Sequence, residues 1–169
     1  MPEEAEATAS LAVSLRQATP DDLEFLHAVY ATTRAEELAV TGWSDAQKAQ
    51  FCRMQSTAQD AHYRQHYPAA QFSIIERAGV PAGRLYVNRG TDEIRIIDIA
   101  LLPEHRRAGI GSSFLRALME EARIGGKVLS IHVEKFNPAL RLYQRLGFQP
   151  REDQGVYLLM DWRGTAAES

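Results

Sequence analysis

The sequence predicts a single α/β (α+β) domain with a mixed, mostly antiparallel sheet of six to seven strands and about four helices. Its 169 residues, 45% of them hydrophobic, suit one domain with a sizeable core. Three apolar stretches separated by tight turns predict an antiparallel meander of strands at 71–77, 83–88 and 93–102. A helix and another strand follow, up to residue 133, and a strand–helix–strand connection of this length makes its two strands parallel.

The first part of the chain predicts one strand and two helices. Residues 11–16 alternate apolar and polar side chains, which indicates a strand. Thr19 and Pro20 then have the residue types that begin a helix, which we expect to reach about Leu38. Ser44 and Asp45 begin a second helix that should end before Pro68. This second helix is only weakly amphipathic, so we interpret its aromatic and histidine residues as a solvated face rather than a pocket lining: His62, Tyr63, His66 and Tyr67.

The rest of the chain predicts two helices and the last strands. A helix is expected at 113–122, followed by a strand at 127–133. A fourth helix should have Asn137 as its N-cap, and a hairpin at 148–150 and 156–162 should complete the sheet. The small polar ends predict frayed tails, so we place the domain at 11–163, between tails at 1–10 and 164–169.

Composition excludes several classes of function. A formal charge of −3 and a pI of about 6.0 provide no basic field, so we expect no nucleic-acid partner. No apolar run is long enough to span a membrane, and the acidic start of the chain is unlike a secretory signal. Cys52 is the single cysteine, which rules out an internal disulfide and leaves a buried thiol as the simplest interpretation. We expect a cytoplasmic protein, and a homodimer is compatible with the sequence.

One turn predicts a phosphate site, the segment Arg106-Arg107-Ala108-Gly109-Ile110-Gly111-Ser112 between a predicted strand and a predicted helix. Two glycines two residues apart let the backbone curve and point successive N–H groups at one spot, where a helix N-terminus adds partial positive charge. A Walker A loop is disfavoured because Ser112, not lysine, follows the second glycine. The dinucleotide fingerprint is disfavoured because Phe114 stands where its third glycine would be.

Together with the sequence around it, this turn resembles the GNAT superfamily of acyl-CoA-dependent N-acyltransferases. Arg106, Gly109 and Gly111 match the family's Arg/Gln-x-x-Gly-x-Gly/Ala pyrophosphate loop. Residues 137–148 closely match its Asn-x-x-Ala-x-x-x-Tyr-x-x-x-Gly-Phe segment, with the alanine one place early at Ala139. Residues 15–23 also look like the family's first strand and helix cap, whereas 38–70 match no motif.

The resemblance implies acetyl-CoA as cosubstrate and an amine, on a small molecule or a protein, as acceptor. It implies that the pantetheine arm pairs with the strand before the loop, where that strand parts from its parallel neighbour. The residues expected to bind the cosubstrate are Ile99, Ala100, Leu101, Arg106, Arg107, Ala108, Gly109, Ile110, Gly111, Ser112, Asn137 and Tyr143.

The expected chemistry is direct attack of a neutral amine on the thioester, with a proton supplied to the leaving thiolate. The resemblance places Tyr143 as the acid, although a tyrosine on the apolar face of a helix can also be a core residue. His132, Glu93 and Asp98 are the candidate bases, and a water chain without a protein base is also open. In a regular strand Glu93 and Asp98 have opposite parity, so only a bulge would bring both to the substrate.

Two further interpretations complete the sequence-based expectations. No metal site is expected, because His62 and His66 have helical spacing but no evident third ligand. The alternative to an enzyme is a catalytically silent acyl-CoA-binding module with a regulatory or interaction role.

Overall fold

The computed structural model describes residues 12–164, and the predicted tails lie outside this range apart from Gly164. Its strands are β1 (Val13–Gln17), β2 (Gln71–Arg77), β3 (Val80–Arg89), β4 (Glu93–Leu101), β5 (Val128–Glu134), β6 (Gln149–Gln154) and β7 (Tyr157–Trp162). Its helices are α2 (Leu23–Ala39), α3 (Asp45–His66), α4 (Ile110–Gly125) and α5 (Leu140–Leu146), with 3-10 turns η1 (Pro20–Asp22) and η2 (Pro103–His105).

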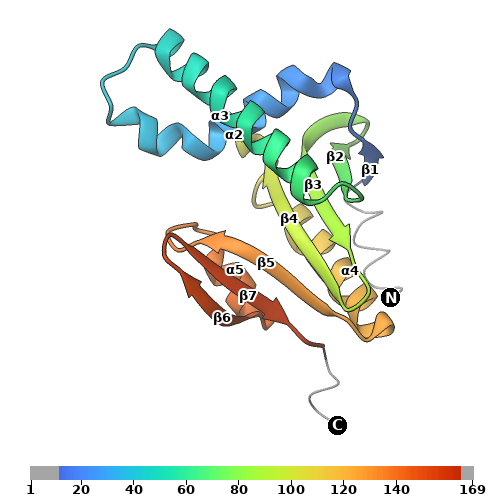
Figure 1. Ribbon diagram of the computed structural model, residues 1–169. Coiled ribbons are helices and arrows are strands. Elements are labelled where there is room, and N and C mark those ends of the chain that lie inside the picture. Colours follow the sequence, from blue (N-terminus) through green and yellow to red (C-terminus); the bar gives the residue numbers. More distant parts are fainter. Residues whose placement is uncertain (1–11, 165–169) are drawn as a thin grey trace.

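The seven strands form one sheet in the order β1-β2-β3-β4-β5-β7-β6. All neighbouring pairs are antiparallel except β4 and β5, which are parallel because α4 connects them. The predicted fold class, the meander and the parallel pair are therefore confirmed. Figure 1 shows that β5, β7 and β6 form a group that diverges from β1 to β4.

The two faces of the sheet are covered by different helices (Figure 1). The main core lies on the face of α4 and α5, where buried leucine and aromatic side chains of these helices pack against strand residues such as Ile94, Ile96 and Leu129. A smaller cluster lies on the other face, where Leu26 of α2 packs near Phe72 and Tyr86 of the sheet. Because α2 and α3 cover this second face only in part, polar strand residues can face a space beneath them.

Local sequence explains where several helices begin and end. The Asp22 carboxylate accepts a hydrogen bond from the Thr19 amide at 2.8 Å, so the expected cap is present, but it starts the turn η1 before α2. Ser44 and Gln47 cap α3 reciprocally, with bonds of 3.1 and 2.9 Å. No described helix is long and apolar enough to cross a bilayer.

The predicted start of the fourth helix is wrong by two residues. Asn137 was expected to be its N-cap, but α5 begins at Leu140 with Ala139 as the N-cap residue. The Asn137 side-chain oxygen instead accepts a hydrogen bond from the Ala139 amide at 2.9 Å. An asparagine can bind an amide two residues ahead in a turn as well as in a helix cap, and the sequence does not distinguish the two.

Candidate active site

The parallel strands β4 and β5 part from each other halfway along. Their pairing runs from Glu93 opposite Val128 to Ile96 opposite Ile131 and then ends. Strand β4 continues to Leu101, and β5 continues to Glu134. The edge of β4 at 97–101 therefore has no ladder partner on this side, and its N–H and C=O groups are available to an extended ligand.

A β-bulge in β4 decides which side chains face this opening. Asp98 pairs with Tyr86 of β3 and Ile96 pairs with Val87, so Ile97 has no residue opposite it. The extra residue reverses the alternation, and Asp98 consequently lies on the same face as Glu93. The bulge that would bring Glu93 and Asp98 to one face is thus present, although the two carboxylates lie at different ends of the strand.

Asp98 is held from two sides by residues of that face. Arg84 Nη2 donates to its Oδ2 at 2.7 Å, and the Tyr63 hydroxyl donates to the same oxygen at 3.3 Å. The side chains of Arg84 and Asp98 are only 5% and 15% exposed. Within the described part of the chain, Oδ1 of Asp98 takes no hydrogen bond, so it is the oxygen left for an acceptor amine.

Glu93 and His132 have different neighbours. The Ser130 hydroxyl donates to Glu93 at 2.6 Å and Arg95 Nη2 donates to it at 3.1 Å. Burial by itself would raise the pKa of Glu93, but the bonds and charge of these partners outweigh it and the pKa lies below its usual value. Glu93 belongs to the first parallel pair, far along β4 from the opening.

His132 directly follows the last paired residue of β5, so it lies where the strands part. Its Nδ1 is 3.1 Å from Arg95 Nη1. Burial and then the charge of Arg95 lower the pKa of His132 below its usual value, which favours a neutral imidazole at pH 7. Of the three candidate bases, Asp98 and His132 border the opening and Glu93 does not.

Tyr143 approaches from the other face of the sheet, on α5. It is 4% exposed and packs edge-on against Phe148, with 5.8 Å between ring centres. Burial, with an added contribution from the charge of Asp98, raises the pKa of its hydroxyl well above the usual range. The phenol therefore keeps its proton near neutral pH, and it forms no hydrogen bond with another residue in 12–164.

The glycine turn leads into α4 as the sequence predicts. Gly109 has a φ of 82°, which favours glycine, and it is the N-cap residue of α4. The first helical bond runs from the Ser113 amide to the Gly109 carbonyl at 3.0 Å, so the three preceding amides, of Ile110, Gly111 and Ser112, have no partner within the helix. A Cβ placed on Gly109 or Gly111 meets nothing within 4 Å, so the space before these amides is open.

The two arginines of the turn point to different places. Arg106 Nε donates to the Leu101 carbonyl at 3.0 Å, and its Nη2 lies 3.4 Å from the Thr32 hydroxyl of α2. Its side chain therefore ties the end of β4 to α2. Arg107 has a φ of 63° and is exposed, with no ion pair inside the described range. Arg107 is thus the arginine better placed to meet an anion at the helix N-terminus.

Sequence reasoning missed several residues that shape this site. The interpretation of α3 as a solvated face is wrong for Tyr63, which bonds Asp98, and for Tyr67, whose hydroxyl is 3.4 Å from Arg95. It holds for His62 and His66, which are exposed. The helical i,i+4 spacing of the two tyrosines was the available signal, whereas a lone Arg84 within an apolar strand gave no indication of its partner.

Comparison with known proteins agrees with this architecture. The family model described as the acetyltransferase (GNAT) family matches residues 33–148, more than half of the chain. A Bacillus subtilis (strain 168) protein provisionally named ribosomal protein bS18-alanine N-acetyltransferase is 33% identical over 85 residues, which cover 49% of this chain and 56% of that protein. The chain thus matches only about half the length of that relative.

Solved structures share the fold. The PaiA N-acetyltransferase of Thermoplasma acidophilum in complex with coenzyme A superposes with a TM-score of 0.67 at 16% identity, covering 89% of this chain and 98% of that one. YncA of Salmonella typhimurium, provisionally named an acetyltransferase and solved with acetyl-CoA, gives 0.56 at 22% identity, covering 90% and 94%. With the family match over 33–148, the chain belongs to the acetyltransferase (GNAT) family.

Proposed function

We propose that the protein transfers acetyl from acetyl-CoA to a primary amine, by direct attack in a ternary complex. The observation that carries this proposal is the parting of β4 from β5 in front of the N-terminus of α4. This arrangement combines an unpaired strand edge with a helix N-terminus suited to an anion. Asp98 lies at this opening, and Tyr143 approaches Asp98 from the other face of the sheet. The coenzyme A and acetyl-CoA held by the Thermoplasma and Salmonella structures support this choice of donor.

The donor side would be held mainly by the backbone. The amides of Ile110, Gly111 and Ser112 would bind the pyrophosphate of coenzyme A, with Arg107 adding a charge-assisted contact. The open space at Gly109 and Gly111 fits a close approach of phosphate to the main chain. The pantetheine arm would lie along Ile99, Ala100 and Leu101, with Ala108 and Asn137 flanking it. This route would deliver the thioester to the opening.

The acceptor side would supply the proton transfers. An acceptor ammonium loses a proton through Asp98 Oδ1, or through a water chain that His132 borders, and the neutral nitrogen attacks the thioester carbon. The carbon–sulfur bond then breaks, and the Tyr143 phenol gives its proton to the departing thiolate. The second proton lost by the nitrogen restores the phenol, and the first proton passes from Asp98 or the water chain to solvent. The net products are an acetamide, coenzyme A with a free thiol and one proton.

Release of coenzyme A thiol from acetyl-CoA, measured over a panel of primary amines, tests the proposal. The panel should include polyamines, free amino acids and a peptide with an N-terminal alanine, since the name of the Bacillus relative points to an alanine amine. At least one amine should accelerate thiol release above the amine-free rate and be recovered as its acetyl derivative. If none does while coenzyme A still binds in a calorimetric titration, the silent acyl-CoA-binding module is the correct interpretation.

A further inference from the structure

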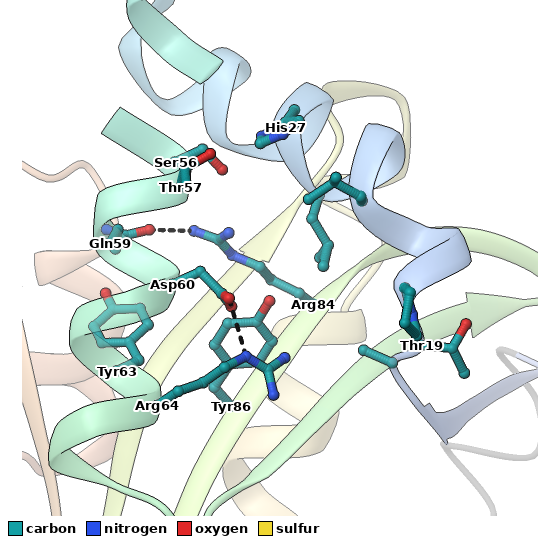
Figure 2. Close-up of a pocket in the computed structure, with 14 residues that line it drawn as sticks. Thr19, His27, Ser56, Thr57, Gln59, Asp60, Tyr63, Arg64, Arg84 and Tyr86 are labelled. Carbon is teal, nitrogen blue, oxygen red and sulfur yellow. Dashed lines mark hydrogen bonds and ion pairs between the residues drawn. The ribbon is translucent and has the colours of Figure 1, made fainter. Parts of the chain in front are cut away.

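A separate cavity of about 350 Å³ lies between α2, α3 and the sheet (Figure 2). We call it the α2–α3 cavity. Its lining residues are Ala18, Thr19, Pro20, Leu23, Leu26, His27, Ser56, Thr57, Gln59, Asp60, Tyr63, Arg64, Arg84 and Tyr86. The exposed members, such as Leu23 and Thr57, form its rim, and the buried ones form its floor. Asp98 is not among them, so the cavity lies behind the Arg84 and Tyr63 side chains as viewed from the opening between β4 and β5.

Two buried residues of this cavity each have a nitrogen without a hydrogen-bond partner among residues 12–164. Arg84 is 4% exposed and uses only Nη2, which bonds Gln59 Oε1 at 3.1 Å and Asp98 Oδ2 at 2.7 Å, while its Nε has no partner. His27 is 8% exposed, and its Nδ1 also has no partner. Buried polar groups in proteins are almost always bonded, because a buried donor without a partner has lost the hydrogen bond that it could make to water. Two such groups in one cavity therefore indicate an absent partner, and for the Arg84 N–H that partner is an acceptor.

The charges in the lining favour an acceptor that is negative. The cavity has two arginines, Arg64 and Arg84, and one carboxylate, Asp60. Arg64 Nε already donates to Asp60 at 2.9 Å, so this pair is balanced. Arg84 shares its charge with Asp98 but leaves two of its three nitrogens without a hydrogen bond inside the described range. An arginine satisfied at one nitrogen can still pair with a planar carboxylate.

The remaining walls are apolar. Leu23, Leu26, Ala18 and Pro20 line the α2 side, and the Tyr86 ring lies at the floor near Arg84. A ligand for this space would need an uncharged, largely apolar body in addition to its negative group. Phosphate or sulfate would leave these walls unfilled, whereas a carboxylate with a short aliphatic or aromatic tail would match both parts.

We propose that the α2–α3 cavity is a second ligand site, which binds a small monocarboxylate with its charged group at Arg84 and His27 and its apolar body against Leu23 and Leu26. In this proposal the carboxylate is the acceptor that these two buried nitrogens lack, with His27 Nδ1 carrying the proton. Arg84 and Tyr63 border this cavity and also hold Asp98, but occupancy of the cavity does not require the protein to be an enzyme.

Titration of the full chain by NMR with hexanoate and phenylacetate tests the site, both with and without saturating coenzyme A. We expect amide shifts at α2 and α3 and a dissociation constant of about 1 mM or lower. The neutral isostere hexanamide should bind at least about tenfold more weakly, because it lacks the charge that Arg84 pairs with. Equal binding of hexanamide, or no shifts from either acid up to about 10 mM, overturns the proposal and leaves ordered water as the missing partner.

Two matched variants locate the site. Leu23 is 53% exposed at the rim, so the Leu23→Trp variant should fold. The larger side chain should narrow the cavity and lower the affinity for hexanoate by about tenfold. Met54 is 59% exposed on α3 but lies outside the lining, so Met54→Trp should leave hexanoate affinity unchanged. Coenzyme A affinity should be the same in both variants. If Leu23→Trp keeps its coenzyme A affinity and also binds hexanoate as tightly as wild type, the acid binds elsewhere and the proposal is refuted.

Discussion

On the side where α4 begins, the groups suited to the donor are main-chain amides from three consecutive residues, 110–112. On the side beneath α3, the groups suited to the acceptor are side chains: Asp98 is bonded to Arg84, 14 positions away in sequence, and to Tyr63, 35 positions away. Backbone geometry at one turn can be specified locally, but a side-chain cluster needs the whole fold to assemble it. Substitutions on the two sides should therefore have different consequences.

The largest expected effect is on the acceptor side, from Asp98→Asn. Loss of the carboxylate at Oδ1 should lower kcat by about 1000-fold, within the range observed for removal of a general base. Steady-state thiol release with an amine that supports turnover measures this, and calorimetry should show coenzyme A affinity unchanged. Glu93→Gln is the matched control on the same strand and face, and it should change kcat by less than about threefold. A larger loss in Glu93→Gln would make Glu93 the base.

On the donor side, Gly109→Val should weaken the binding of coenzyme A by about 100-fold, because the variant would lose two or more charge-assisted hydrogen bonds to the pyrophosphate. The branched side chain is strained at a φ of 82° and would occupy the open space before the helix. Gly126→Val controls for strain, because it places the same residue at a φ of 65° at the other end of α4. Calorimetric titration with coenzyme A compares the two variants. Equal affinity of Gly109→Val and wild type would contradict binding of the pyrophosphate at this turn.

Tyr143→Phe sharpens the comparison because the proposed acid acts on the donor thiolate while lying near the acceptor carboxylate of Asp98. If the phenol protonates the thiolate, kcat should fall by about tenfold to 100-fold, with coenzyme A affinity nearly unchanged. Stability should also change little, because the hydroxyl has no hydrogen-bond partner within 12–164 and the ring packing on Phe148 is retained. Thiol-release kinetics and urea unfolding give the two readouts. An unaltered kcat would make Tyr143 a core residue, the other interpretation of the sequence.

The smallest expected effect is the pH dependence contributed by His132. Its native pKa is lowered by burial and Arg95, whereas in the unfolded chain it is about 6.5. The unfolded state therefore binds the proton first, and the native state loses stability as the pH falls below about 6.5 until the native group also protonates. Between pH 7 and pH 5, His132→Gln should lose less unfolding free energy than wild type in urea titrations. A steeper loss of unfolding free energy in the variant would mean that the native pKa of His132 is raised rather than lowered.

The fold and the donor turn were predictable because their determinants are local. The cap residues Ser44 and Asp45 and the stop before Pro68 predicted α3 close to its observed bounds, Asp45–His66. The connection between the strands at 93 and 133 required the parallel pair. The two glycines of the turn before α4 had the spacing that a tight approach to a helix N-terminus needs. Each of these inferences depends on one short segment or one connection along the chain, and none depends on side-chain contacts between distant parts of it.

The acceptor side could not be read from the sequence, for a physical reason. The bulge at Ile97 depends on how β3 pairs with β4, and that pairing alone turns Asp98 toward α3 and Arg84. The α2–α3 cavity likewise exists only because two helices lie across strands that are distant in sequence. The sequence by itself determined the fold class, the parallel pair and the glycine turn that begins α4. The tertiary structure decided which carboxylate meets which arginine, because register and helix packing, not local propensity, bring those side chains together.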